Sequence, residues 1–391
     1  MRRDIRYHAW GGTGGFDAGV HAGTRTGPGG LVLATAGGRT DYLDPFRGGT
    51  TTYEYATWSS PWAQPGFAAS QAVASWNAVT PGGTWIQAEL RGATPDGART
   101  TWYVLGRWAA DDIEFLRTSV PGQSDTHARV DSDTLVVADG AALVAWQLRI
   151  TLYRPAGTAE SPTVRSAGVM VSRLPAPAAH PTSTPVTALG TALPVPGYAQ
   201  KLHAGQYPQW DNGGASWCSP TSTSMVLAYW GAGPTPADYA WVDPSYLHPW
   251  IDHAARSTYD HHYTGCGNWP FNTAYAARFG LCAFVTRMRS LNEVEQFIDA
   301  GVPVIVSASF TRDEIPGADY ATDGHLMVVV GFTGDGDPVM NDPMAADNAG
   351  VRKVFGRAQF ETAWRNSSGG TVYLIHPPTV ALPAAPAQAN W

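Results

Sequence analysis

Three residues in the C-terminal half could together carry out nucleophilic chemistry: Cys218, His325 and Asp342. A cysteine thiolate attacks a carbonyl carbon, a histidine takes and returns the proton, and a carboxylate holds the histidine in one tautomer and orientation. Cys218 follows the turn-forming DNGGAS (211–216) and opens a run with helical pattern. A helix N-terminus favours a thiolate, so we predict that Cys218 is the nucleophile of a Cys–His–Asp site.

The other two members lie on predicted strands. His325 begins the apolar run HLMVVVGFT (325–333). Asp342 directly follows the next run, DPVMN (337–341). Adjacent antiparallel strands would bring the carboxylate beside the imidazole. Asn341 and Asp323 would take its place if the register differed by one residue. The alternatives to catalysis are a buried structural cysteine, a satisfied core histidine and a turn Asp before Pro.

Such a site also needs a donor for the oxyanion, commonly a glutamine side chain together with the amide of the nucleophile. Gln200, Gln206 and Gln209 all precede Cys218. Position alone does not choose among them.

Four segments resemble the bacteriocin-processing cysteine peptidase family, and in particular its stand-alone actinobacterial branch. They are LPVPGYAQ (193–200), WCSPTSTSMVLAYWG (217–231), DGHLMVVVG (323–331) and NDP (341–343), and the resemblance covers about residues 190–376. It implies a papain-like α+β fold and a Cys–His–Asp triad at Cys218, His325 and Asp342. It also implies that the oxyanion glutamine is Gln200.

The sequence departs from that family in two places. Gln200 precedes Cys218 by more residues than is usual, which implies an inserted loop over Lys201–Ser216; without an insertion, Gln209 would take the oxyanion role. The usual CGP at the nucleophile is CSP here. Nothing resembles the transporter segments fused to leader-cleaving members, so leader cleavage is not carried over.

The elements that must position these residues differ between the two halves. Alternating runs such as TWIQAEL (84–90) and AWQLRITLY (145–153) predict an N-terminal all-β sandwich over 1–174, serving as an accessory or binding domain. A Pro-rich linker is predicted over 175–192. Helices are predicted over about 218–229, from 270 to near 280, from 290 to 301 and over about 357–365, with strands between and after them. We therefore expect a papain-like α+β peptidase domain over 193–376 and a flexible tail over 377–391.

Composition excludes several classes of function. The formal net charge is −7, and no basic tract is present, so a nucleic-acid partner is not expected. No apolar run is long enough to span a membrane. The histidine-rich stretch 248–262 lacks the spacing of a zinc helix, so we interpret it as a solvated loop or the rim of a substrate cleft and predict neither a metal site nor a cofactor.

Localisation and redox state depend on weaker signals. The start, MRRDIRYHAWGG, is not a complete signal peptide. The short spacing of Cys266 and Cys282 allows a disulfide, and two buried thiols fit equally well. With the family resemblance, these signals favour a secreted or cell-envelope location.

The sequence thus predicts a cysteine peptidase acting on a peptide or protein substrate, with cell-wall peptides among the candidates. Amide hydrolysis or acyl transfer on cell-wall peptides is a second enzymatic hypothesis, because the same triad serves it. A non-catalytic glycan- or peptide-binding protein is a third.

Overall fold

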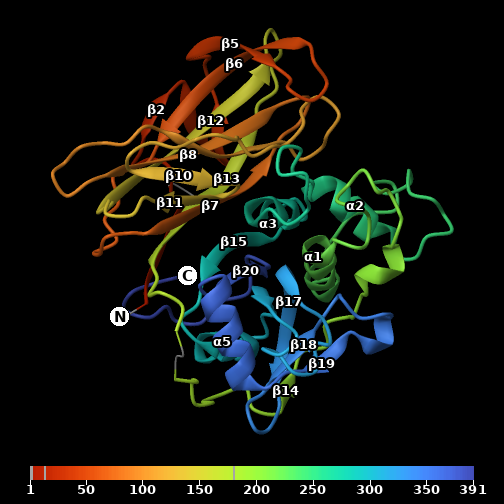
Figure 1. Cartoon of the computed structure of the whole chain (residues 1–391). Coiled ribbons are helices and arrows are strands. Elements are labelled where there is room, and N and C mark those ends of the chain that lie inside the picture. The colour runs from red at the N-terminus through yellow and green to blue at the C-terminus, as the bar shows by residue number, and fades with distance from the viewer. Residues whose placement is uncertain (1–2, 13–14, 179–180) are drawn as a thin grey trace. The chain divides into compact units, whose positions relative to one another are not determined.

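The computed structural model describes residues 3–12, 15–178 and 181–391, which form two compact units. One unit consists of residues 6–173 with 260–264. The other holds the described residues of 174–259 and 265–390, together with residues 3–5. Figure 1 shows strands throughout the first unit, and helices beside a sheet in the second.

The N-terminal unit is built from two antiparallel sheets. One has the strand order β10-β11-β7-β13-β4-β3, with β1 pairing β13; the other has the order β2-β6-β12-β8-β9, with β5 pairing β6. The strands are β1 (Asp4–Gly11), β2 (Val20–Ala22), β3 (Thr24–Gly27), β4 (Gly30–Leu33), β5 (Gly38–Leu43), β6 (Thr50–Ser59), β7 (Gln71–Val79), β8 (Trp85–Ala93), β9 (Tyr103–Trp108), β10 (Ala128–Asp131), β11 (Thr134–Val137), β12 (Ala145–Pro155) and β13 (Thr163–Arg173).

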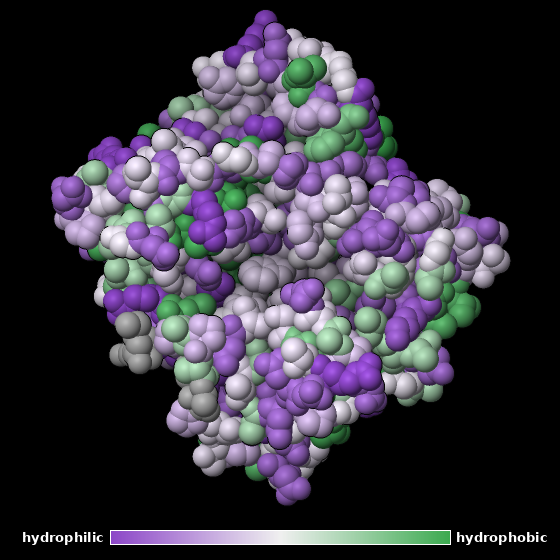
Figure 2. Space-filling view, viewed as in Figure 1, coloured by the Kyte–Doolittle hydropathy of each residue, from purple (hydrophilic) through white to green (hydrophobic). Residues whose placement is uncertain are grey.

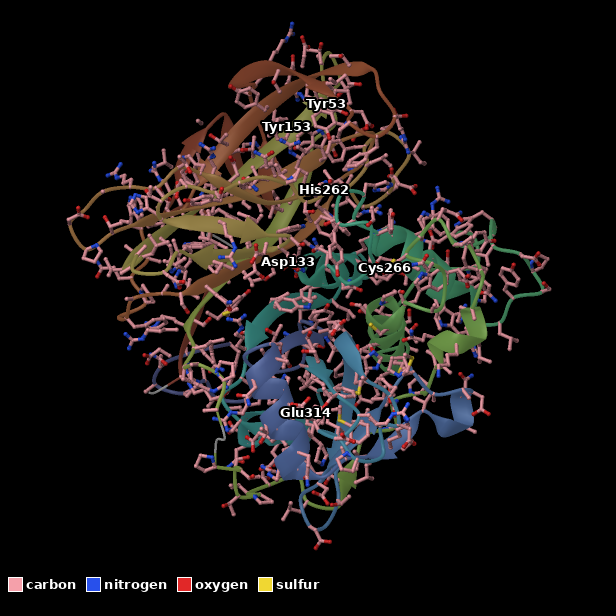
Figure 3. The ribbon with its side chains drawn as sticks, viewed as in Figure 1. Tyr53, Asp133, Tyr153, His262, Cys266 and Glu314 are labelled. Atoms are coloured by element: carbon pink, nitrogen blue, oxygen red, sulfur yellow. The ribbon has the colours of Figure 1, made fainter. Side chains whose placement is uncertain are left out.

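Alternation along the central strands explains the core of this unit. In β12 the residues Leu148, Ile150 and Leu152 are fully buried, and their neighbours on the strand form the other face of the sheet. Large aromatic rings complete the packing: Trp85 stacks on Tyr153 with ring centroids 3.7 Å apart, and Tyr53 meets Trp85 edge-on. Figure 3 labels Tyr53 and Tyr153 among these strands. Tryptophan side chains of this half therefore pack in its core, and the buried ones include Trp58, Trp76, Trp85 and Trp108.

The C-terminal unit combines helices with one antiparallel sheet of order β15-β20-β16-β17-β18-β19, with β14 pairing β17. Its helices are α1 (Cys218–Tyr229), α2 (Pro249–Thr258), α3 (Trp269–Ala277), α4 (Leu291–Asp299) and α5 (Arg357–Ser367), with short 3-10 turns at Gln200–His203 and Asn348–Gly350. Its strands are β14 (Thr191–Ala192), β15 (Cys282–Arg287), β16 (Val304–Phe310), β17 (Thr322–Phe332), β18 (Pro338–Asn341), β19 (Arg352–Val354) and β20 (Thr371–His376).

Helix α1 is buried along most of its length, so it packs on several neighbours instead of presenting one face to solvent. It contacts α2, α3 and β17. Small hydroxyl side chains satisfy this burial by bonding across the contacts. Ser219 Oγ lies 3.0 Å from the Tyr373 hydroxyl of β20, and Ser222 Oγ donates to the carbonyl oxygen of Leu326 in β17 over 2.9 Å. Cys218 is thus fixed at one end of a helix anchored to the sheet.

Helix α2 was not predicted. The solvated loop expected over 248–262 is wrong for residues 249–258, which are helical. Ile251, Ala254, Ala255 and Thr258 are buried at helical spacing, and Pro249 occupies the first helical position, where a missing N–H costs nothing.

The disulfide left open by the sequence is absent, because Cys218, Cys266 and Cys282 are all thiols. Cys266, labelled in Figure 3, belongs to the C-terminal unit. It is fully buried, and its Sγ donates to the carbonyl oxygen of Ala255. Cys282 begins β15, opposite His376. A disulfide therefore gives no support for a secreted location.

The segment 377–391, expected as a flexible tail, has no helix or strand. Near its end, however, Asn390 is buried and donates its side-chain amide to the carbonyl oxygen of Arg287 and to Glu293. Arg289 also reaches the side chain of Asn390.

Within the described residues, no helix is both long and apolar enough to cross a membrane. Hydrophobic residues appear on the face seen in Figure 2 in small groups between hydrophilic ones.

Candidate active site

Cys218 is the first residue of α1, and the helix begins there because the preceding chain is tied down. Trp217, the N-cap residue, is fully buried and donates its indole N–H to the carbonyl oxygen of Trp210 over 2.6 Å. The backbone N–H groups of the first helical turn have no partner within the helix, so the positive end of the helix dipole lies at Cys218. Cys218 itself is partly exposed.

His325 lies on β17 opposite Ala308 of β16, and the register of the next strand places the carboxylate beside it. Val328 of β17 pairs with Asn341 of β18, so Asp342 continues the ladder opposite Met327. Met327 and His325 are two residues apart on one strand and share a face, and diagonal neighbours on a sheet are within side-chain reach. His325 Nε2 accordingly lies 2.8 Å from Oδ1 of Asp342.

With Nε2 committed to Asp342, the other ring nitrogen of His325 is left to serve the Cys218 side chain, which lies close enough to His325 to shift its pKa. Burial by itself lowers the pKa of His325. The hydrogen bonds to Asp342 and Cys218 outweigh it and raise that pKa to about 9. The imidazole is therefore held in its protonated form at neutral pH, next to the sulfur.

The Asp342 carboxylate is fully buried and fully hydrogen-bonded. Oδ1 accepts from His325 and from the backbone N–H of Met344 at 2.9 Å, and Oδ2 accepts from the Tyr320 hydroxyl at 3.1 Å and from Lys353 Nζ at 3.0 Å. Burial would raise the pKa of Asp342, but the hydrogen bond and charge of His325 and the charge of Lys353 hold it well below its usual range. Asp342 is an anion under ordinary conditions.

The two substitutes considered for Asp342 do not reach His325. Asn341 turns its side chain to the other side, where Nδ2 donates to the carbonyl oxygens of Val195 and Pro196. Asp323 is exposed at the start of β17.

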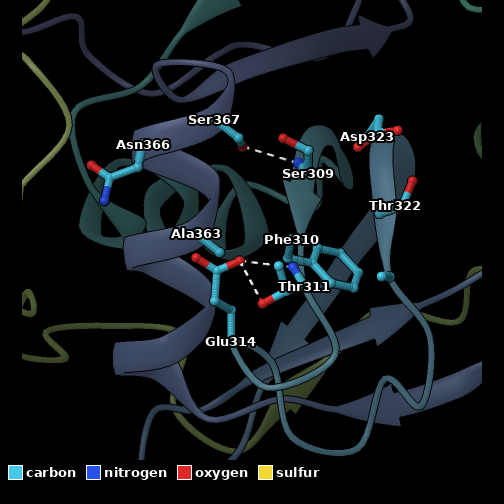
Figure 4. A pocket seen from close by; sticks show the side chains of 10 residues that line it. Ser309, Phe310, Thr311, Glu314, Thr322, Asp323, Ala363, Asn366 and Ser367 are labelled. Carbon is cyan, nitrogen blue, oxygen red and sulfur yellow. Dashed lines mark hydrogen bonds between the residues drawn. The ribbon is translucent and has the colours of Figure 1, made fainter.

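Asp323 instead lines a cavity of about 320 Å³ where β16 ends and β17 begins (Figure 4). Its wall is largely polar. The Glu314 carboxylate accepts from the N–H and Oγ of Thr311, and the N–H of Ser309 donates to Ser367 Oγ. The cavity therefore flanks the strand that carries His325 and contributes two acidic side chains, Glu314 and Asp323.

Gln200 is buried, and its side chain points toward the residues just before Cys218. Its Nε2 donates to the carbonyl oxygen of Ala215 over 2.9 Å, while Oε1 has no partner. An amide NH₂ carries two hydrogens, so one donor remains after this bond. Gln209 is exposed, and Gln206 bonds the buried His203.

The chain between Gln200 and Cys218 folds back on itself. Ala204 pairs with Gly213 in an isolated bridge, and the N–H of Gly214 donates to the carbonyl oxygen of His203. The residues between Gln200 and Cys218 thus form a compact loop, although the two are far apart in sequence.

Sequence reasoning missed Tyr320 and Lys353. A lysine on a short strand and a tyrosine in a loop carry no local signal, and only the strand register brings them to Asp342. Within the described ranges, no three His, Cys, Asp or Glu side chains group as metal ligands.

Comparison with known proteins gives two matches to families, one for each half. The family described as the peptidase C39 N-terminal domain matches residues 6–172, and the C39-like peptidase family matches residues 192–372. No curated protein matches the chain.

Two solved structures are similar to parts of the chain. A C39-like peptidase from Bacillus anthracis is 17% identical and covers 47% of this chain and 96% of its own, with a TM-score of 0.29. A structure of carbohydrate-binding modules from the β-sandwich superfamily is 10% identical and covers 43% of this chain and 54% of its own, with a TM-score of 0.16.

Proposed function

Because this chain belongs to the C39-like peptidases, by its matches over 6–172 and 192–372, we propose that it hydrolyses peptide bonds with Cys218 as the nucleophile. One observation carries the proposal: His325 is hydrogen-bonded through Nε2 to the buried Asp342, and the Cys218 side chain lies close enough to His325 to help raise its pKa. This is the order of contacts that a thiol, a base and an orienting carboxylate require.

The proposed reaction begins from the ion pair in which His325 already holds the proton of the Cys218 thiol. The thiolate attacks the peptide carbonyl carbon, and His325 gives its proton to the leaving amine as the C–N bond breaks. Water, deprotonated by the now neutral His325, attacks the resulting thioester and releases the carboxylic acid, which restores the thiolate beside the protonated His325. Asp342 keeps the imidazole oriented and stabilises its charged form throughout.

We further assign the oxyanion donors as the free Nε2 hydrogen of Gln200 and the backbone N–H of Cys218. Donors fixed before the reaction stabilise the charge that develops on the carbonyl oxygen. The bond from Gln200 to the carbonyl oxygen of Ala215 supports this role, because it fixes the amide before substrate arrives.

The finer parts of the proposal concern the setting of the reaction. We propose a papain-like arrangement for the C-terminal unit and a β-sandwich for the N-terminal unit, which would bind or position the substrate. A secreted or cell-envelope location and a cell-wall-associated peptide substrate also belong to the proposal. The family matches do not favour acyl transfer or a purely binding role.

The test is labelling of Cys218 with iodoacetamide across pH, comparing the wild type with His325→Ala. The proposal expects rapid labelling at or below pH 7 that is lost in the variant. Labelling that begins only above about pH 8, as for an ordinary thiol, and is unchanged by the substitution would refute it. Digestion of a mixed peptide library, with Cys218→Ala as the blank, would then show which bonds are cleaved.

A further inference from the structure

Asp342 is bound by two basic side chains from the strands on either side of it. His325 of β17 lies 2.8 Å from Oδ1, and Lys353 of β19 lies 3.0 Å from Oδ2. The carboxylate is fully buried, whereas the Lys353 side chain is 23% exposed. One negative charge therefore serves two cations when His325 is protonated.

The register explains why Lys353 reaches this carboxylate. Asn341 pairs with Arg352, and the N–H of Asp342 donates to the carbonyl oxygen of Val351, so Asp342 lies opposite Val351. Lys353 is two residues further along the same strand and shares the face of Val351. It is the diagonal neighbour of Asp342 on β19, just as His325 is on β17.

Tyr320 lies between the two basic groups. Its hydroxyl donates to Oδ2 of Asp342, its ring meets the His325 ring edge-on at 5.5 Å, and Lys353 Nζ is 5.6 Å from the ring centroid. Burial, followed by the charge of Asp342, raises the pKa of Tyr320, so the phenol remains a neutral donor. The network is closed: both oxygens of Asp342 are saturated.

Lys353 changes what Asp342 can do for His325. A carboxylate with one cationic partner stabilises an imidazolium strongly, and a strongly stabilised imidazolium is a poor acid. The reaction needs His325 to release its proton to the leaving amine, which is easier when the imidazolium is not over-stabilised. A second cation on the same carboxylate weakens the attraction for the first.

From this juxtaposition we infer that Lys353 is a positioning residue of the reaction: it holds Asp342 in place and limits how firmly Asp342 retains the proton on His325. The inference rests on the proposed function. The titratable groups that face His325 are Cys218 from α1, Tyr320 from the loop before β17 and Asp342 after β18, with Lys353 acting through Asp342. Removing Lys353 should therefore keep His325 protonated to higher pH.

The experiment measures the rate of Cys218 alkylation by iodoacetate between pH 5 and pH 11. Iodoacetate is an anion, so its rate falls as His325 loses its positive charge, and the alkaline limb reports the proton on His325. In Lys353→Met the midpoint of this alkaline limb should shift to higher pH by about one unit, the size expected for removal of a nearby unit charge. For a peptide that the wild type cleaves, the kcat of Lys353→Met should also be lower than that of the wild type, with little change in KM.

Two variants separate charge from structure. Lys353→Arg keeps the cation and should leave the limb within a few tenths of a unit of the wild type. Arg352→Met removes a cation from the same strand that bonds Asn341 and Val195 instead of Asp342, and it should not move the limb. If Lys353→Met fails to fold, Lys353→Gln tests the same loss of charge.

The outcomes distinguish the inference from the function beneath it. If alkylation in the wild type has no alkaline limb, or keeps its limb in His325→Ala, the proposed Cys–His pair is wrong and the inference falls with it. If the limb depends on His325 but does not move in Lys353→Met, or moves equally in Arg352→Met, the inference alone is wrong.

Discussion

The backbone N–H of Gln200 donates to the carbonyl oxygen of Pro343 over 2.8 Å. The residue after Asp342 therefore fixes the backbone of the proposed oxyanion donor. Asn341, on the other side of Asp342, holds the carbonyl oxygens of Val195 and Pro196 in the segment that leads to Gln200. The middle residue of this three-residue motif thus orients the histidine, and its two neighbours position the proposed oxyanion donor.

Asn341→Ala should loosen the Gln200 segment without touching the triad. The carbonyl oxygens of Val195 and Pro196 and the Arg352 side chain would each lose a hydrogen bond to Asn341, at a cost of about 1–3 kcal/mol in the free energy of unfolding. We expect kcat to fall while Cys218 still labels rapidly at pH 7. Urea unfolding and iodoacetamide labelling measure the two effects, with the exposed Gln296→Ala as the control. Loss of labelling equal to the loss of kcat would contradict the separation of roles.

Gln200→Ala should remove an oxyanion donor. Loss of one such donor typically lowers kcat by about 10²- to 10³-fold, and KM and thiol labelling should change little. Gln209→Ala is the matched control, because Gln209 is an exposed glutamine of the same loop. A strong loss of kcat in Gln209→Ala with none in Gln200→Ala would reverse the assignment. Steady-state hydrolysis of one peptide decides between them.

Sequence patterns predicted the elements that carry the triad, because their signals are local. The helix expected over 218–229 is α1, and the run 325–333 falls on β17 with a slightly earlier start. The helix predicted from 290 to 301 is α4. The Ser290 side chain makes no capping hydrogen bond, and Glu293 accepts from the N–H of Arg289.

The parts that could not be predicted depend on contacts between distant segments. Helix α2 is rich in polar residues because Asp252 and His253 are buried against partners such as His203 and Tyr275, which only the fold supplies. Lys353 and Tyr320 became visible only through the strand register. Position in the sequence does not choose among the three candidate glutamines, and the bond from Gln200 to Ala215 that supports the proposed assignment depends on the closure of the loop.

Gly214→Ala should disturb catalysis by a purely steric route. A methyl group there would lie 2.3 Å from the carbonyl oxygen of Gln200 and 2.4 Å from the carbonyl carbon of His203, closer than any real contact. The loop would have to move away from Gln200, so we expect lower stability and lower kcat. Gly334→Ala, where a methyl group meets nothing within 4 Å, is the control. Thermal unfolding and peptide hydrolysis test both, and equal behaviour of the two variants would refute the prediction.

Stability should fall as pH rises through the alkaline range because of His325. Its pKa is raised in the folded protein from 6.5 to about 9, so its contribution is complete below pH 6.5 and is lost as pH rises through 9. The free energy of unfolding of the wild type, minus that of His325→Gln, should therefore decline between pH 6.5 and pH 9.5. Urea unfolding at several pH values measures this difference, and a constant difference across the window would contradict the raised pKa.

The loop between Gln200 and Cys218 leaves and returns at nearly the same point, since Ala204 meets Gly213 and Gly214 lies against His203. The entropy of closing such a loop grows only slowly with its length, by about 0.6 kcal/mol for each doubling. Its tip, around Pro208 and Gln209, is exposed. A graft of new residues at that tip would therefore leave the distance between donor and nucleophile unchanged, which makes this the natural point at which to engineer selectivity separately from rate.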